Sequence, residues 1–351
     1  MQRRTFLTTV AALVAGCRDR GRAFPTPGRQ RGVGFDAFRT RPTARDFVEL
    51  RELGVTHVAL FPFGYMRAHT EPVVRRFQGK RTDWSLTDEG LLTTGLLARR
   101  AYLRVILIPT LADFVDGHWR GEVRMADDRE WAMWFTSYRA FLLHYAGLAG
   151  KMRAVGLSVG TELRETVQRE GEWRETITMV RERFPGWLTY AGNWDDYDRV
   201  PWWDALDLIG IQAYFELGDP GAASSATDPR AHLIGAWAPI KERMAELSSS
   251  TGKRVAFTEI GYKSHAGATA FPWRWEIEGP PDLELQRAAY EAAFEAFWRE
   301  PWFAGFYWWK WRPNAQSDED YERDFTPQGK PAEEVLRRYY SGEDGGSGFE
   351  V

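Results

Sequence analysis

The sequence is short of cysteine, of net charge and of nucleotide-binding loops, and each shortage excludes a class of protein. Cys17 is the only cysteine among 351 residues, so the chain can form no disulfide of its own. The formal net charge is only −3, which argues against nucleic acid as the main partner because such binding needs concentrated basic charge. The six histidines show neither H-x-H nor H-E-x-x-H spacing, so we expect no metal and no cofactor.

Aromatic residues, in contrast, are abundant. The chain contains 17 Trp, and aromatic residues make up 15% of its length. Large flat rings often line clefts that stack on sugar faces, although many such rings belong to the core. The composition is therefore compatible with a carbohydrate cleft and does not by itself demand one.

The N-terminus has the layout of an export signal rather than of a folded element. A charged head precedes an apolar segment from Phe6 to Ala15, which is too short to cross a bilayer as a stable helix. Arg3-Arg4-Thr5-Phe6-Leu7 resembles the twin-arginine export motif. Val14-Ala15-Gly16-Cys17 resembles a lipoprotein cleavage box in which Cys17 is the lipidated residue.

We therefore expect residues 1–17 to be a twin-arginine, lipoprotein-type signal peptide. Residues 18–30, rich in Arg, Gly and Pro, would form a tether. The exported protein would then lie in the cell envelope, attached to the membrane through a lipid anchor on Cys17. The alternative is a disordered or helical N-terminus with an accidental cysteine.

From Arg31 onward, short apolar runs alternate with longer amphipathic segments, the pattern of repeated βα units. We expect eight strands, at residues 31–38, 56–63, 102–111, 154–163, 187–193, 207–215, 254–262 and 303–311. The expected helices cover residues 43–53, 86–100, 128–152, 172–184, 229–250, 282–299 and 332–340, and the 194–206 connection is a poor helix.

This pattern predicts a single (β/α)₈ barrel over residues 31–341, followed by a flexible tail at 342–351. The main alternative is a doubly wound open sheet. Such a sheet usually carries a glycine-rich phosphate loop after its first strand, and the chain contains no G-x-G-x-x-G or G-x-x-x-x-G-K motif.

Two glutamates close two of the predicted strands. Glu162 ends the fourth strand and Glu259 ends the seventh, so both would point into the rim where barrel active sites lie. Alternation along the fourth strand would place Gly156, Ser158 and Gly160 on the same inward face as Glu162. The alternative is that either glutamate is a rim residue paired with an arginine or capping a helix.

Two carboxylates across a pocket are what retaining glycoside hydrolysis requires. One carboxylic acid protonates the leaving oxygen while the other, ionised and about 5–5.5 Å away, attacks the anomeric carbon. The two strand-end glutamates therefore suggest this chemistry.

The chain also resembles a known family. Three runs carry the resemblance, namely Asp116-Gly117-His118-Trp119-Arg120-Gly121-Glu122-Val123, Gly160-Thr161-Glu162-Leu163 and Phe257-Thr258-Glu259-Ile260-Gly261-Tyr262. They are similar to glycoside hydrolase family 113 of the retaining (β/α)₈ clan, whose known members include β-mannanases. The resemblance implies Glu162 as general acid/base and Glu259 as nucleophile.

Further roles follow from the same resemblance. The clan usually has Asn before the acid/base, where this chain has Thr161, so Asn193 becomes the candidate for binding the sugar 2-hydroxyl. The alternative interpretation of Asn193 is that it is a turn residue. Tyr214 would donate a hydrogen bond to the nucleophile carboxylate, and its alternative is a core aromatic residue.

Aromatic side chains are the candidates for sugar platforms. Strand alternation sends one of Trp308 and Trp309 into the site and the other outward, without deciding which. Trp119, His118 and Trp84 are candidates for outer subsites, and each has loop packing as its alternative.

These observations lead us to expect a monomeric, exported, lipid-anchored retaining glycoside hydrolase. Its substrate would be a β-linked polysaccharide or oligosaccharide, with mannan as the first hypothesis. The alternatives are a barrel that binds carbohydrate without cutting it, and a transglycosylase that shares the covalent intermediate. The sugar, the linkage and endo or exo action depend on loop walls that the sequence does not place.

Overall fold

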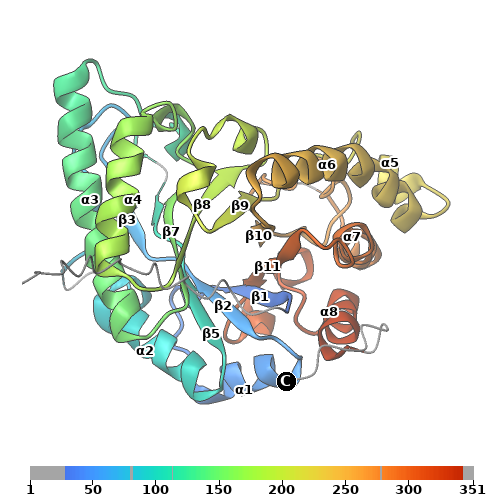
Figure 1. The fold of residues 1–351 in the computed structure, drawn as a ribbon. Helices are drawn as coiled ribbons and strands as arrows, with labels where there is room; N and C mark the ends of the chain where they lie inside the picture. The colour runs from blue at the N-terminus through green and yellow to red at the C-terminus, as the bar shows by residue number, and fades with distance from the viewer. Residues whose placement is uncertain (1–27, 80–81, 113, 277–278, 343–351) are drawn as a thin grey trace, which may run out of the picture.

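Eight parallel strands close into a barrel in the order β1-β11-β10-β9-β8-β7-β5-β2 (Figure 1). Their bounds are β1 (Gln30–Phe35), β2 (His57–Leu60), β5 (Arg104–Leu107), β7 (Gly156–Thr161), β8 (Trp187–Asn193), β9 (Leu208–Gln212), β10 (Val255–Ile260) and β11 (Phe303–Trp311). The predicted (β/α)₈ barrel is confirmed.

The computed structural model describes residues 28–79, 82–112, 114–276 and 279–342. The expected signal peptide with Cys17, most of the expected tether and residues 343–351 of the expected tail lie outside this part of the chain. Within the described residues, no helix combines the length and the apolar character that crossing a membrane requires.

The helices surround the barrel (Figure 1). Their bounds are α1 (Ala44–Glu52), α2 (Asp88–Arg100), α3 (Asp128–Lys151), α4 (Glu170–Arg183), α5 (Ala222–Ser225), α6 (Pro229–Thr251), α7 (Leu283–Phe297) and α8 (Pro331–Ser341). Side-chain caps begin several of them, as when Asp127 accepts a hydrogen bond from the backbone of Glu130 at α3. Between β8 and β9 the chain forms only short 3₁₀ turns, as the poor helical pattern of that connection predicts.

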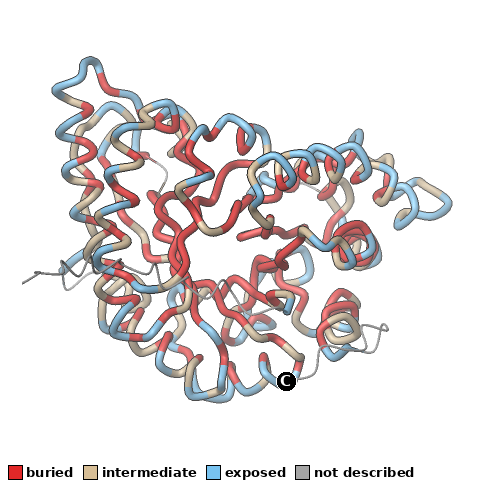
Figure 2. Tube along the Cα trace, in the orientation of Figure 1, coloured by how far each residue is buried: buried red, intermediate tan, exposed pale blue. Residues whose placement is uncertain are grey.

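Most tryptophans belong to the core, which has two layers. The barrel interior is filled by small and medium side chains together with Trp187 and Tyr307. A larger layer between strands and helices includes the stacked rings of Trp173 and Trp202, whose centroids are 4.9 Å apart. Figure 2 shows that buried residues follow the strands and that exposed residues lie on the outer faces of the helices.

Two of the predicted strands are each broken in the structure. The 56–63 run divides into β2 and β3 (Phe63–Tyr65), and the 102–111 run divides into β5 and β6 (Thr110–Leu111). Each break contains a proline, Pro62 or Pro109, which has no N–H to donate to the ladder. Beyond the breaks, β3 and β6 form a small sheet with β4 (Arg75–Arg76).

An irregularity in β7 reverses the expected alternation. Ser158 pairs with Thr189 but Thr161 pairs with Ala191, so β7 holds one extra residue in this interval. A Cβ on Gly160 would lie 2.9 Å from the rings of Trp173 and Tyr190, in the layer under the helices. The expectation that Gly160 shares the inward face with Gly156 and Ser158 is therefore wrong, because the extra residue turns it outward.

Close packing inside the barrel makes one glycine hard to replace. A Cβ on Gly210 of β9 would lie 2.6 Å from the carbonyl oxygen of Tyr190, whereas one on Gly150 of α3 has nothing within 4 Å. We expect Gly210→Ala to lower the free energy of unfolding by about 1–3 kcal/mol through overpacking. The matched control Gly150→Ala should leave it unchanged or raise it by up to about 1 kcal/mol. Urea unfolding measures both, and equal midpoints for Gly210→Ala and the unmodified chain would contradict the prediction.

Candidate active site

A cavity of about 490 Å³ lies at the carboxyl ends of the barrel strands. Its lining includes six residues expected from the sequence, namely Trp119, Glu162, Asn193, Tyr214, Glu259 and Trp309. They come from different strand ends or from the loops that follow them, and the closure of the barrel brings them to one place. The cavity is therefore the candidate active site.

Glu259 of β10 is held by donors from β9 and the residues after it. The hydroxyl of Tyr214 donates to Oε1, and Nε2 of Gln212 donates to Oε2 at 3.0 Å. The Gln212 amide is itself oriented because the hydroxyl of Thr258 donates to its oxygen at 2.9 Å. Gln212 was not expected from the sequence, although its position at the end of a barrel strand is a signal that could have singled it out.

The environment of Glu259 acts on its pKa in both directions. Removal from bulk water raises the pKa of Glu259 to about 7, and the nearby charge of Glu162 also raises it. The hydrogen bond from Tyr214 and that from Gln212 lower the pKa, because both favour the ionised carboxylate.

Glu162 follows β7 on a backbone with φ of 53°, in the left-handed region. Its carboxylate oxygen Oε2 accepts a hydrogen bond from Arg120 at 2.6 Å and one from the Trp119 indole at 3.3 Å. Arg120 is fixed in turn because its Nε donates to the carbonyl oxygen of Leu111. The sequence does not predict this ion pair, although Arg120 lies in one of the runs that carry the family resemblance.

Polar residues after β7 and β8 form a second group at the rim. Arg164 pairs with Asp196 at 2.8 Å and with Asp195, and its guanidinium lies 5.0 Å from the Trp119 ring centre. Burial raises the pKa of Asp196 to about 6, although Arg164 opposes the change. Asn193 donates to Asp195 at 2.6 Å and also lines the cavity, so it combines a turn contact with a place in the site.

Thr161 faces the cavity but has its hydroxyl engaged with the barrel. The hydroxyl donates to the carbonyl oxygen of Pro109 at 3.0 Å, and this bond connects the end of β7 to the segment between β5 and β6. The hydroxyl of Ser158 donates to Gly160 O at 2.6 Å within β7. The Gly156–Gly160 segment has a G-x-S-x-G pattern, yet this buried strand serine forms no nucleophile elbow.

The structure decides which of the two adjacent tryptophans enters the cavity. Trp309 lines it, with its ring set edge-on to Phe61 at 5.1 Å between centroids. Trp308 is fully buried and stacks on Tyr290 of α7 at 3.7 Å. Trp309 is therefore the ring available to a ligand, and Trp308 belongs to the layer under the helices.

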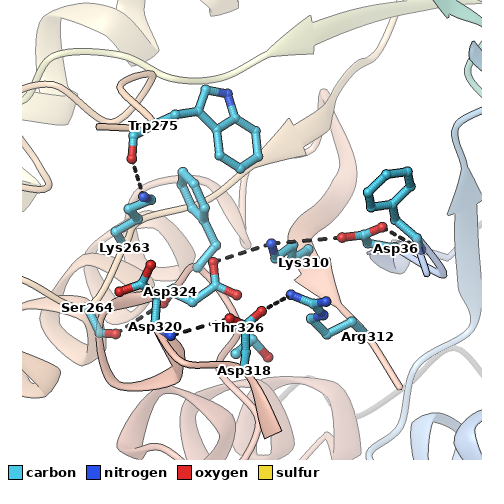
Figure 3. A network of polar contacts seen from close by, with 12 residues as sticks. Asp36, Lys263, Ser264, Trp275, Lys310, Arg312, Asp318, Asp320, Asp324 and Thr326 are labelled. Atoms are coloured by element: carbon cyan, nitrogen blue, oxygen red, sulfur yellow. Dashed lines mark hydrogen bonds and ion pairs between the residues drawn. The ribbon is translucent and has the colours of Figure 1, made fainter. Parts of the chain in front are cut away.

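A network of polar contacts surrounds Lys310, the residue that follows Trp309 in β11 (Figure 3). Lys310 Nζ lies 3.3 Å from Asp324 and 3.8 Å from Asp36, so it connects the ends of β11 and β1. Lys263 donates to the carbonyl oxygen of Trp275, a residue that lines the cavity and is 56% exposed. Trp275 was not expected from the sequence because its loop has no strand or helix pattern to place it.

Besides Trp308, two expected residues do not line this cavity. The ring of Trp84, in a 3₁₀ turn before α2, lies 4.8 Å from the guanidinium of Arg41. The ring of His118 lies 3.7 Å from that of His69, and its Nδ1 is 3.0 Å from Glu122. Neither residue lines the cavity that holds the two glutamates.

A closed barrel with two carboxylates in one strand-end cavity is the architecture of a glycoside hydrolase. The sequence profile described as Glycoside Hydrolase Family 113 matches residues 32–330. The chain belongs to this family.

Solved structures agree with this membership. The GH113 beta-mannanase AaManA from Alicyclobacillus acidocaldarius, in complex with ManMIm, has 30% identity and a TM-score of 0.77, over 90% of this chain and 98% of the other. A GH113 beta-1,4-mannanase has 28% identity and a TM-score of 0.76, over 90% and 99% of the two chains. A family 5 mannosidase from Rhizomucor miehei, at 11% identity over 90% and 93% of the two chains with a TM-score of 0.60, shares the fold. No curated protein sequence matches the chain significantly.

The hydroxyl of Tyr214 provides a direct test of the site electrostatics. Because its hydrogen bond lowers the pKa of Glu259, we expect Tyr214→Phe to raise that pKa beyond about 7. A ¹³C NMR titration of labelled glutamate carboxylates measures the change. Tyr262→Phe is the matched control, since the buried Tyr262 hydroxyl has no hydrogen-bond partner among the described residues. An unchanged or lowered pKa of Glu259 in Tyr214→Phe would refute the assignment of this contact.

Proposed function

We propose that the chain is a retaining glycoside hydrolase that cleaves β-linked mannan or its oligosaccharides, with Glu259 as nucleophile and Glu162 as general acid/base. The observation that carries the proposal is the pair of glutamates at the ends of β10 and β7, both lining one cavity. The mannan substrate is supported by the similar structures of family 113, which are described as beta-mannanases.

The reaction takes two displacements. In the first, a Glu259 oxygen attacks the anomeric carbon while the glycosidic bond breaks, and the departing oxygen takes a proton from Glu162. In the second, Glu162 takes a proton from water, whose oxygen attacks the same carbon and releases Glu259. A sugar hydroxyl in place of the water would give transglycosylation through the same intermediate.

The two glutamates exchange charge during this cycle. Before the first step Glu259 is ionised and Glu162 carries a proton; afterwards Glu259 is a neutral ester and Glu162 is ionised. Tyr214 and Gln212 stabilise the first anion, and Arg120 stabilises the second. Arg120 would therefore stabilise the negative charge that develops on Glu162 as its proton is transferred. An interaction that strengthens toward the transition state accelerates the reaction.

The charge exchange also sets a requirement on the acid. In the free site the guanidinium of Arg120 lies 2.6 Å from Oε2 of Glu162. Glu162 must present a proton to the leaving oxygen in the first step while Glu259 is ionised and attacks. Because burial raises the pKa of Glu259 to about 7, kcat/KM should fall as the pH drops through that value, since a protonated Glu259 does not attack.

The aromatic walls suggest how the sugar is held. Trp309, on β11, would provide the platform under the sugar that is cleaved, with Phe61 supporting its edge. Asn193 lies at the end of β8 and is our candidate for the sugar 2-hydroxyl, because the Thr161 hydroxyl is already bonded to Pro109. Trp275 on a separate loop would extend the site.

We also propose that the enzyme is exported and anchored to the membrane by a lipid on Cys17. The support is the order of a twin-arginine segment, a short apolar segment and a single cysteine. A large polysaccharide cannot easily enter a cell, so a hydrolase attached to the envelope would meet its substrate there.

Removing each glutamate should give distinct kinetic results. We expect Glu259→Ala to lower kcat on mannan by on the order of 10⁶-fold, as does loss of a covalent nucleophile elsewhere. Glu162→Ala should lower kcat on mannan by about 10²–10⁴-fold and much less on an aryl mannoside whose leaving group needs no proton. Initial rates on both substrates measure this difference.

The exposed Glu165, close to Glu162 in the chain, gives a matched control, and Glu165→Ala should retain activity. Product stereochemistry and a panel of mannan, glucomannan, glucan and xylan complete the test. An initial product of inverted configuration, seen by ¹H NMR, would rule out Glu259 as nucleophile. Faster cleavage of xylan or glucan would reject mannan and leave the mechanism intact.

Attachment to the membrane is tested by Cys17→Ser. We expect the protein of native sequence to fractionate with membranes and to be released by detergent, because its lipid is buried in the bilayer. Cys17→Ser should appear in the soluble fraction with its hydrolytic activity retained. Membrane association of Cys17→Ser equal to that of the unmodified protein would contradict the anchor.

A further inference from the structure

Three side chains that could ligate a metal gather near the loop that carries Trp119, a residue of the active-site cavity lining. They are His69, in the loop between β3 and β4, and Asp116 and His118, in the loop after β6. One ligand atom from each lies within 4.8 Å of the other two. Nδ1 of His69 is 2.8 Å from Asp116, and the two imidazole rings have centroids 3.7 Å apart.

The donor set has the chemistry of a zinc site. Two imidazoles and one carboxylate provide three of the four ligands that zinc usually takes, and water can supply the fourth. Glu122 provides a further feature, since its carboxylate is 3.0 Å from Nδ1 of His118. A carboxylate in this position orients a metal-binding histidine and leaves the other ring nitrogen, Nε2, for the metal.

The backbone holds this cluster in place independently of the imidazoles. The backbone amide of His69 donates to Asp116 at 3.2 Å, and the carbonyl oxygen of His69 accepts from Arg124 at 3.0 Å. A tight turn places Asp116 and His118 together, with Gly117 at φ of 81° and its amide donating to Phe114 O. The ligands would need only small side-chain adjustments to close on an ion.

His144 forms a similar histidine–carboxylate contact that lacks the other features of a metal site. Nε2 of His144 lies 2.8 Å from Asp88, the same distance as that between Nδ1 of His69 and Asp116. Its neighbour on the same nitrogen is the guanidinium of Arg76, at 2.8 Å. A cation occupies the place where a second histidine would be needed, so this pair should not bind a metal ion.

We propose that His69, Asp116 and His118 bind one Zn²⁺, with Glu122 orienting His118. The ion would join two loops that are far apart in the sequence. The second loop also carries Trp119 and Arg120, whose side chains both donate to Glu162. Zinc would therefore position the two donors of Glu162. This last consequence rests on the proposed function, whereas zinc binding itself does not.

Calorimetric titration of the metal-free protein with zinc chloride tests the proposal. The protein is purified without a histidine tag, and we expect one Zn²⁺ per chain. His118→Gln and Asp116→Asn should abolish this binding event, and Glu122→Gln should weaken it by about 10–100-fold. His144→Gln is the matched control and should bind zinc as the unmodified protein does. An unmodified protein that takes up no zinc, or a His118→Gln variant that binds it equally well, would overturn the proposal.

Two further measurements keep the test independent of folding and of hydrolysis. Thermal unfolding without metal shows whether each variant is folded. Added zinc should raise Tm for the protein of native sequence and for His144→Gln, raise it less for Glu122→Gln, and leave it unchanged for His118→Gln and Asp116→Asn. Co²⁺ in place of zinc should give visible absorption bands of a four-coordinate site, and these should be lost in His118→Gln. A rise in Tm of the same size in all variants would show that zinc binds elsewhere and would also overturn the proposal.

Discussion

Two carboxylates in one cavity repel each other, and much of the barrel rim holds both of them there. Like charges removed from water cannot both ionise at little cost, and the pKa of Glu259 at about 7 reflects that removal together with the charge of Glu162. Each of the two carboxylates accepts hydrogen bonds from a different set of donors. Tyr214 and Gln212 hold Glu259, whereas Arg120 and Trp119 hold Glu162. This asymmetry lets one chemical group serve two roles.

The backbone makes this arrangement possible by departing from a regular strand. The extra residue in β7 turns Gly160 toward the helices and Thr161 toward the cavity, and Glu162 then adopts a left-handed conformation. Such irregularities are found where a barrel must redirect a side chain near its active site. The hydroxyl of Thr161 ties the irregular end of the strand to Pro109.

Aromatic residues divide into structural rings and rings exposed to the cavity, and the division follows the layers of the fold. Trp308 and Trp309 are neighbours in the sequence, yet one stacks on Tyr290 under the helices and the other faces the cavity. Trp275 reaches the same cavity from a loop that is held by the network around Lys310. Loops thus complete a site that the strands begin, as is common in barrels of this type.

Hydrophobic periodicity and position at a strand end are local properties, so the eight strands, most of the helices and the two strand-end glutamates could be predicted from the sequence. It also narrowed the sugar platform to Trp308 or Trp309. The choice between them required the folded barrel, since packing against α7 sets which of the two rings points toward the helices and which toward the cavity. The pairing of Arg120 with Glu162 and of His69 with Asp116 likewise joins residues 42 and 47 positions apart. No local pattern records such contacts, because closure of the barrel and its loops alone brings these side chains together.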